Sequence, residues 1–249
     1  MMNYGGFFLY NYKEEKMIKK AFNIDNIPAI LWGEDSSNFL IAVHGNQSSK
    51  ADVPISILAE EAGARGYQVL SFDLPQHGER KGEERLCKVQ YCVEELIKIR
   101  EFAQKRATTI SIFACSMGAY FTLLAYKDMP LERCLFLSPV LNMESIIQNM
   151  MTWFDVSEER LQNEQEIATP IGEVLYWDYY SYVKTNPILY WNAPTSILYG
   201  EKDELCEWEY VEAFAKKFQS RLEIVPNASH YFQTTEQLET YRNWLKTLL

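Results

Sequence analysis

The sequence predicts an α/β fold, with a mostly parallel central sheet and helices on both of its faces. Short apolar runs rich in β-branched and aromatic residues alternate with longer segments that repeat apolar residues at helical spacing. This alternation is typical of parallel sheets, because parallel strands need long crossover connections. Of the 249 residues, 47% are hydrophobic, which is sufficient for one large core.

The first strands and helices follow from the order of these patterns. The run Phe39–Val43 is apolar and ends at a His-Gly pair, which predicts a buried strand stopped by a loop. The helical spacing that starts at Val53 stops near Gly66. The remaining strands of the parallel sheet are expected at 67–72, 109–114, 134–137, 195–199 and 222–225. Helices are expected at 53–64, 89–103, 119–126, 208–218 and 237–248.

Two further segments near the N-terminus, 17–24 and 29–32, have no helical pattern between them. A connection too short for a crossover helix allows only antiparallel pairing. We therefore expect these two strands to pair antiparallel at one edge of the sheet.

Residues 140–194 interrupt the alternation. They contain no convincing strand and are rich in methionine and aromatic residues. Structureless loops longer than about 15 residues are uncommon inside compact domains. We therefore expect a small helical cap here, inserted into a core formed by 1–139 and 195–249.

Charge and cysteine usage exclude several classes of function. The net charge of −10 repels phosphate backbones and anionic lipid surfaces, so neither nucleic acid nor a membrane is an expected partner. The segment Met1–Lys20 lacks the uninterrupted apolar run of a signal peptide, which predicts a cytoplasmic protein. The five cysteines are odd in number and show no zinc-ligand spacing, so we expect reduced thiols and no metal site.

The segment Ala114-Cys115-Ser116-Met117-Gly118 lies between an expected strand and an expected helix. A serine on such a sharp turn needs small residues two positions before and after it, because the strand and helix backbones approach closely there. Ala114 and Gly118 meet that requirement around Ser116. Cys115 does not qualify as a nucleophile of this kind, since Phe113 and Met117 are too large.

With this motif the sequence resembles the α/β-hydrolase family, whose order of elements covers nearly the whole chain. In the family a serine nucleophile is followed along the chain by an acid and then by a histidine. The resemblance implies that the acid is Asp203, in Gly200-Glu201-Lys202-Asp203 after a strand, with Glu201, Glu204 and Glu207 as nearby rivals.

Three histidines are present, at positions 44, 77 and 230, and only His230 follows both Ser116 and Asp203. It lies in Asn227-Ala228-Ser229-His230-Tyr231, after the last expected strand. A neutral imidazole held by a carboxylate can accept the serine proton at pH 7. The motif around His77 resembles a structural loop of the family.

The resemblance also implies an oxyanion hole, which is a pair of N–H groups that stabilise the negatively charged oxygen of the intermediate. One donor would be the backbone N–H of Met117. The other would come from the loop Val43-His44-Gly45-Asn46, with Asn46 as the expected donor and Gln47 as a weaker candidate. His44 itself is expected to be structural.

Together these residues imply acyl transfer to water through a Ser116-His230-Asp203 triad, with a small-molecule acyl substrate and no cofactor or metal. Carboxylic-ester hydrolysis is the leading expectation, and thioesterase, peptidase and aminopeptidase activities stay open. A haloalkane dehalogenase is disfavoured, because its nucleophile is an aspartate. A non-catalytic ligand-binding homologue is the alternative from another class. The oligomeric state is not predicted.

The last expectation concerns substrate binding. Caps of this family commonly cover the nucleophile, so aromatic residues of the insertion would roof an apolar pocket that faces Ser116. The four residues expected to bind substrate are Trp153, Trp177, Tyr180 and Trp191.

Overall fold

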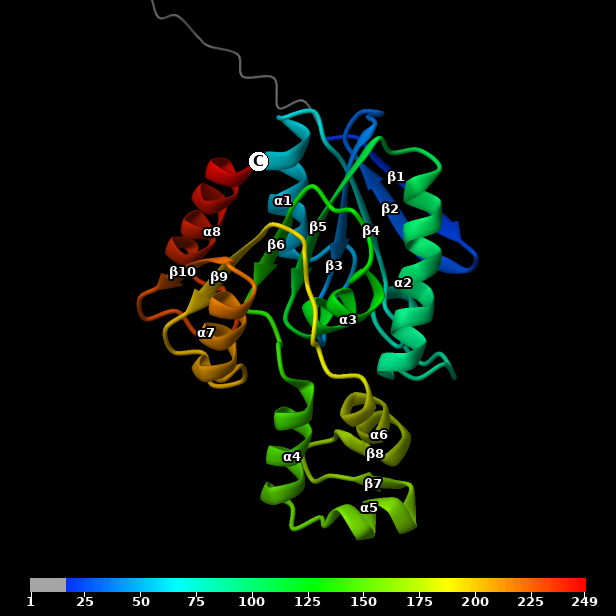
Figure 1. The fold of residues 1–249 in the computed structure, drawn as a ribbon. Helices are drawn as coiled ribbons and strands as arrows, with labels where there is room; N and C mark the ends of the chain where they lie inside the picture. Colours follow the sequence, from blue (N-terminus) through cyan, green and yellow to red (C-terminus); the bar gives the residue numbers. More distant parts are fainter. Residues whose placement is uncertain (1–16) are drawn as a thin grey trace, which may run out of the picture.

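The computed structural model describes residues 17–249, and its centre is an eight-stranded sheet (Figure 1). The strand order is β1-β2-β4-β3-β5-β6-β9-β10. The last six strands in this order run parallel, while β1 and β2 form an antiparallel hairpin that adds to β4 at the edge. The strands are β1 (Lys19–Ile24), β2 (Ile27–Trp32), β3 (Asn38–Val43), β4 (Gln68–Phe72), β5 (Thr109–Cys115), β6 (Cys134–Leu137), β9 (Thr195–Gly200) and β10 (Arg221–Val225).

Four helices connect these strands, a fifth follows the last strand, and together they cover the sheet. They are α1 (Val53–Gly63), α2 (Val89–Gln104), α3 (Met117–Ala125), α7 (Trp208–Lys217) and α8 (Thr235–Leu248), and a short 3-10 helix, η1 (Gly78–Arg80), precedes α2. The predicted fold class, its antiparallel edge included, is therefore confirmed.

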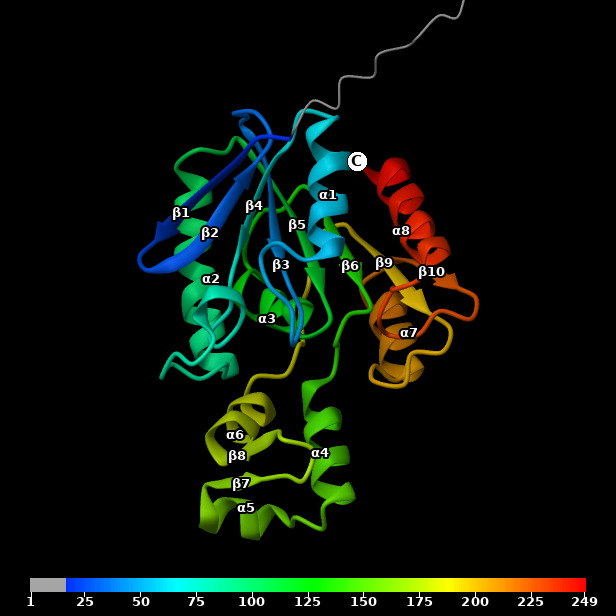
Figure 2. The ribbon, with the colours of Figure 1, turned by 180° about the vertical axis from the view of Figure 1, so that it is seen from behind.

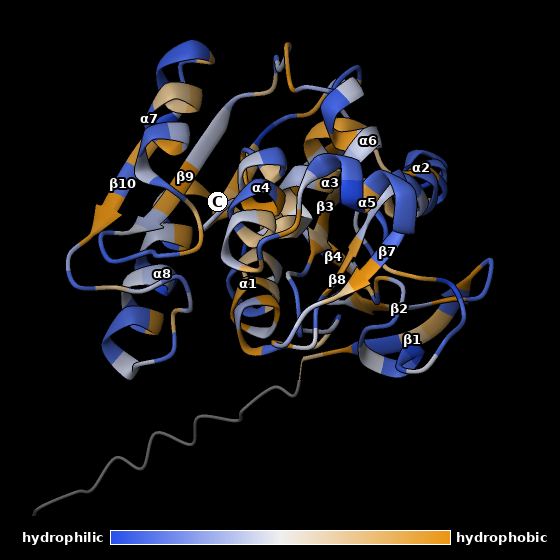
Figure 3. Ribbon diagram, turned by 90° about the horizontal axis from the view of Figure 1, so that it is seen from below, coloured by the Kyte–Doolittle hydropathy of each residue, from blue (hydrophilic) through white to orange (hydrophobic). Residues whose placement is uncertain are grey.

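The two faces of the sheet bury different side chains, because successive residues of a strand point to opposite sides. In β3, Leu40 and Ala42 join the apolar cluster under α1 and α8. Phe39, Ile41 and Val43 join the cluster under α2, α3 and α7. Figures 1 and 2 show these helices on the two sides of the sheet. In Figure 3 the ribbon around β3 and β4 is largely orange, while α2 at the periphery is largely blue.

The segment between β6 and β9 extends beyond the carboxyl ends of the parallel strands (Figure 1). It contains α4 (Met143–Trp153), α5 (Glu158–Glu164), β7 (Glu166–Ala168), β8 (Val174–Tyr176) and α6 (Trp177–Thr185). We call residues 140–194 the insertion. The expectation of no strand here is wrong, because β7 and β8 pair as a two-stranded antiparallel sheet. Each strand has only three residues, which is too short for an alternating pattern to be recognised.

Most of the segment Met1–Lys20, on which the expectation about a signal peptide rests, lies outside the described residues. Within residues 17–249, no helix has both the length and the apolar character needed to cross a bilayer.

Candidate active site

Ser116 lies on the tight turn between β5 and α3, with φ 49° and ψ −124°. A positive φ is sterically unfavourable for a residue with a side chain, so the surrounding structure must hold it. The Ser116 N–H donates to the Leu137 carbonyl (3.1 Å), and its own carbonyl accepts from the Val140 N–H (3.0 Å). A Cβ added to Gly118 would lie 2.4 Å from the His44 carbonyl oxygen, so this position needs glycine.

Asp203, His230 and Ser116 form a continuous line of hydrogen-bonding groups. The Nδ1 atom of His230 lies 2.8 Å from Oδ2 of Asp203, and its Nε2 atom lies 2.9 Å from Oγ of Ser116. The side chain of Asp203 is fully buried and that of His230 is 5% exposed. This arrangement fits a neutral imidazole that donates from Nδ1 to the carboxylate and accepts the serine proton at Nε2.

The loop after β9 orients the carboxylate. Oδ1 of Asp203 accepts the backbone N–H groups of Leu205 and Cys206, each at 2.9 Å, which leaves Oδ2 for His230. Two of the rival carboxylates have other partners: Glu207 accepts from the Ser145 and Asn149 side chains, and Glu201 accepts the backbone N–H of Asn227. The third rival, Glu204, is exposed.

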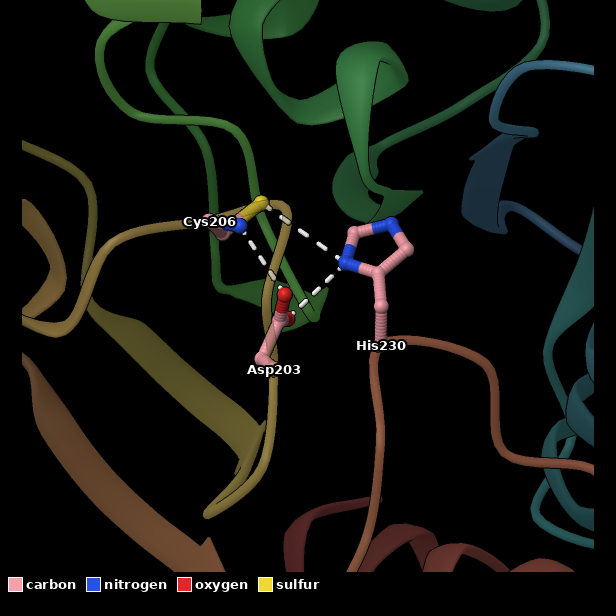
Figure 4. Close-up of side chains that lie close together, drawn as sticks. All are labelled: Asp203, Cys206 and His230. Carbon is pink, nitrogen blue, oxygen red and sulfur yellow. Dashed lines mark hydrogen bonds and ion pairs between the residues drawn. The ribbon is translucent and has the colours of Figure 1, made fainter.

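Cys206 is a third polar group beside this pair (Figure 4). Its Sγ atom lies 3.7 Å from Nδ1 of His230 and 3.7 Å from the carbonyl oxygen of Ser138. Sγ, a carboxylate oxygen of Asp203 and a ring nitrogen of His230 lie within 4.8 Å of one another, close enough for a metal ion. Burial first, and then the Asp203 carboxylate, raise the pKa of the Cys206 thiol, which opposes the thiolate that a metal requires. The direct hydrogen bond between Asp203 and His230 fits a catalytic pair better.

The loop after β3 lies directly against the serine. A Cβ added to Gly45 would be 3.1 Å from Cβ of Ser116. His44 anchors the loop, because its Nδ1 donates to the Gly45 carbonyl (2.8 Å) and its Nε2 accepts the N–H of Leu74 (3.0 Å). Burial lowers the pKa of His44 to about 4, so the imidazole is neutral in this role.

The two expected oxyanion donors are Met117, which follows Ser116 directly, and Asn46, which lines the same cavity as Ser116. The N–H of Met117 belongs to the first turn of α3, where a helix leaves its N–H groups without an intrahelical acceptor. The side chain of Asn46 contacts both the core and the insertion. Its Oδ1 atom lies 3.1 Å from Nε2 of His77 in the core, and its Nδ2 atom donates to Glu173 of the insertion (3.4 Å). These side-chain contacts fix the position of the Asn46 backbone.

A cavity of about 550 Å³ opens on the serine. Its wall contains Ser116, His230 and the loop after β3, together with side chains at the N-terminal ends of α1 and α8. The lining residues are Gly45, Asn46, Gln47, Ser48, Asp52, Val53, Pro54, Cys115, Ser116, Leu137, Ser138, His230, Tyr231, Phe232, Gln233 and Leu238.

The four aromatic residues expected to bind substrate do not line this cavity. Trp153 is 66% exposed at the end of α4. Trp191 is 5% exposed, stacks near Phe136 and donates from its indole N–H to Thr195 (2.8 Å). Trp177 and Tyr180 pack against each other within the insertion. Apolar patterning cannot distinguish a side chain that packs on the core from one that faces a cavity.

The sequence interpretation missed the residues at the ends of α1 and α8. Val53 and Pro54 begin the helix that follows the loop after β3, and Phe232 and Leu238 follow His230 closely along the chain. This proximity in sequence to the motif residues is the signal that could have found them.

No protein-family model matches the sequence, and no curated protein matches it. Solved structures do match. Est1E from Butyrivibrio proteoclasticus with bound ferulic acid superposes with a TM-score of 0.75 at 20% identity, over 92% of this chain and 97% of that one. A putative hydrolase from Agrobacterium vitis gives a TM-score of 0.77 at 14% identity, covering 94% of this chain and 99% of the other. The esterase Pf2001 of Pyrococcus furiosus gives 0.67 at 18% identity, over 94% and 90%.

These likenesses extend over nearly the full length of both partners in each comparison. The eight-stranded, mostly parallel sheet is consistent with the fold of these proteins. The chain therefore has the α/β-hydrolase fold.

Proposed function

We propose that the protein is a serine hydrolase that cleaves carboxylic ester bonds. Ser116 acts as the nucleophile, His230 as general base and then general acid, and Asp203 as the group that orients the imidazole. The observation that carries the proposal is the continuous contact from Asp203 through His230 to Ser116, with distances of 2.8 and 2.9 Å. A nucleophile, a base and an orienting acid in this geometry are sufficient for acyl transfer.

In the first half of the reaction, Oγ of Ser116 attacks the ester carbonyl carbon while Nε2 of His230 takes the hydroxyl proton. The carbonyl oxygen becomes an oxyanion, stabilised by the backbone N–H groups of Met117 and Asn46. His230 then returns the proton to the departing alcohol, which leaves an acyl group on Ser116. Asp203 stabilises the imidazolium that exists between the two proton transfers.

In the second half, a water molecule takes the place of the alcohol. His230 removes a proton from that water, which attacks the acyl carbon, and the same two N–H groups stabilise the second oxyanion. Proton return from His230 to Oγ of Ser116 releases the carboxylic acid. All the groups used are side chains and backbone amides of this chain, with no cofactor and no metal in the proposed reaction.

We favour esters over thioesters and amides as substrates on the basis of two structures that are similar to this chain. One is named as an esterase, and the other, Est1E, holds ferulic acid, a free carboxylic acid. A cavity of about 550 Å³ is suited to a small molecule. We propose an uncharged small-molecule ester as the partner, neither nucleic acid nor a membrane, since the chain carries a net charge of −10. A cytoplasmic location is proposed because all five cysteines are free thiols.

The test combines active-site labelling with a substrate panel. A fluorophosphonate probe is expected to label Ser116 in the natural chain and to leave the Ser116→Ala variant unlabelled. The panel contains p-nitrophenyl acetate, butyrate and octanoate, methyl ferulate, an acyl thioester and an aminoacyl amide. We expect the highest kcat/KM on an oxygen ester.

Two outcomes would decide against the proposed catalytic residues, and a third would change the proposed substrate. Labelling at another residue would remove Ser116 from the reaction. Absence of labelling and of hydrolysis in a folded protein would favour a non-catalytic ligand-binding protein with the same fold. A higher kcat/KM on the thioester or the amide would keep the triad and change the substrate class.

A further inference from the structure

A second pair of reactive groups lies outside the catalytic line, at the start of α2. Sγ of Cys87 and Sγ of Cys92 are 3.7 Å apart. Cys87 is half-buried in the irregular segment before the helix, whereas Cys92 is fully buried in its first turns. A disulfide needs the sulfur atoms at about 2.0 Å. Because Cys87 precedes the helix, rotation of its side chain can provide this approach without unwinding α2.

The surroundings of Cys87 favour its thiolate. The N-terminus of the 16-residue helix α2 lies beside it, and helix N-termini stabilise negative charge. A hydrogen bond from the Cys92 thiol, followed by the interaction with His77, lowers the pKa of Cys87 to about 6. Cys92 is affected in the opposite direction, because burial and its bond to Cys87 raise its pKa. These opposite shifts favour the thiolate at Cys87 and the thiol at Cys92.

The hydrogen bonds of His77 support the same charge state. Its Nδ1 atom lies 2.8 Å from the Pro75 carbonyl oxygen and its Nε2 atom lies 3.1 Å from Oδ1 of Asn46. Both neighbours accept hydrogen bonds, so only an imidazolium, with two N–H groups, satisfies both. Cys87 and, more weakly, Asp73 carry the negative charge that stabilises this imidazolium and contributes to the raised pKa of His77.

We propose that Cys87 and Cys92 are a redox modification site, in which a hydroperoxide oxidises the pair to a reversible intramolecular disulfide. The proposal depends on the position of the two sulfur atoms, on the helix N-terminus and on His77. It is independent of the catalytic assignment. All five cysteines, this pair included, are free thiols in the structure, which is the reduced state of the proposed couple.

The chemistry balances with a hydroperoxide as the only added reactant. The Cys87 thiolate attacks one peroxide oxygen, so that an S–O bond forms and the O–O bond breaks. The departing alkoxide, or hydroxide when the oxidant is hydrogen peroxide, takes a proton from the His77 imidazolium and leaves as an alcohol or as water. The sulfur of Cys92 then attacks that of Cys87, an S–S bond forms, and the hydroxyl leaves with the Cys92 proton as water. The two thiols together lose two electrons, and the peroxide gains them.

The modification is connected to the active site through His77. In the disulfide, Cys87 carries no charge, so His77 loses the partner that stabilises its second proton. It can then donate to either the Pro75 carbonyl or Asn46, but not to both. Asn46 is the proposed oxyanion donor, so oxidation weakens the contact that fixes its position. This consequence, unlike the disulfide itself, rests on the proposed function.

The test exposes the full-length protein to hydrogen peroxide, alkylates all remaining thiols after denaturation and digests the product with trypsin. Trypsin cleaves after Lys88, between the two cysteines, so the disulfide joins peptide 86–88 to peptide 89–98. We expect this joined species by mass spectrometry, its separation by dithiothreitol, and alkylated Cys115, Cys134 and Cys206. Hydrolysis of p-nitrophenyl acetate is expected to fall about tenfold on oxidation, less than the 10²–10³ for complete loss of an oxyanion donor, and to recover on reduction.

Variants separate the possible outcomes. Cys92→Ser should retain a sulfenic acid at Cys87 that reacts with dimedone, Cys87→Ser should stay reduced, and the matched control Cys134→Ser should still form the joined peptides. The site is disproved if Cys87 remains a thiol while free cysteine in the same tube is oxidised, or if it pairs with another residue or molecule. Joined peptides with unchanged hydrolysis would disprove the connection through His77. An inactive reduced protein that still forms the disulfide would disprove the proposed function alone.

Discussion

The Nε2 atom of His230 lies 2.9 Å from the Oγ atom of Ser116, close enough for direct proton transfer. Ser116→Ala and His230→Ala should each reduce kcat on an activated ester by at least about 10³-fold, because each removes a member of the proposed catalytic unit. The double variant should lose little more than either single variant. Steady-state kinetics with circular dichroism as a folding control measure this, and multiplicative losses would contradict a shared role.

The orientation of His230 depends on Asp203. Asp203→Asn should lower kcat by about 10⁴-fold, because an amide favours the wrong tautomer of the imidazole. Glu207→Gln is the matched control, since Glu207 lies on the same loop but binds Ser145 and Asn149. A larger loss in the Glu207 variant would mean that the acid has been assigned to the wrong residue.

The turn that carries Ser116 has no room for a side chain at Gly118. Gly118→Ala should lower the free energy of unfolding by about 1–3 kcal/mol, since its Cβ would lie 2.4 Å from the His44 carbonyl oxygen. Gly63→Ala, at an exposed site in the last turn of α1 with no atom within 4 Å of the added Cβ, should raise it by about 0.5–1 kcal/mol. Urea unfolding of both variants provides the comparison, and equal effects would show that the two sites do not differ in packing.

His44 should make stability depend on pH. Its pKa of about 4 in the folded state is below the 6.5 of an unfolded histidine, so the unfolded chain binds more protons between these values. Neutral His44 therefore contributes up to about 3 kcal/mol to the free energy of unfolding above pH 6.5, and this contribution is lost as the pH falls towards 4. His44→Gln should remove this part of the pH dependence. The free energy of unfolding is measured with urea at pH 7, 6 and 5. If it changes with pH equally in both proteins, burial does not lower the pKa of His44.

Substitutions of two tryptophans in the insertion should have different effects on the free energy of unfolding. Neither substitution should change the substrate preference. Trp191→Ala should lower the free energy of unfolding by about 3–5 kcal/mol, because Trp191 is buried against Phe136. Trp153→Ala should change it by less than about 0.5 kcal/mol, because Trp153 is exposed. Neither should alter the ratio of kcat/KM for butyrate and octanoate esters. An altered ratio would restore these residues as substrate contacts.

Sequence reasoning located the sheet and selected three candidate site residues that the structure brings together, and both results have a physical reason. Strands such as β3 and β5 are buried on both faces, so their composition is distinctive, and the serine, the acid and the histidine follow strand ends where a parallel sheet gathers its loops. The order of the residues along the chain then restricted the choice, since one histidine follows both Ser116 and Asp203.

The insertion could not be predicted to the same depth. The strands of its hairpin are three residues long, and its aromatic residues pack in the insertion or against the core, or lie at the surface. Contacts made across the molecule leave no periodic signal in either partner. Two examples are the contact between Cys206 and His230 and the contact between His77 and Asn46. Such pairs are separated in sequence and come together only when the loops are placed.

The insertion leaves the sheet after β6 and the chain returns to β9, which is the neighbour of β6 in the sheet. It is therefore a detour within a single crossover connection between neighbouring parallel strands, and no other strand connection depends on its length. Shortening, lengthening or exchanging residues 143–185 would leave the pairing of Cys134 with Thr195 unchanged. Residues 143–185 also contact the loops around the candidate site, because Glu173 accepts from Asn46 and Asn149 donates to Glu207. A replacement segment would therefore have to supply these two contacts again.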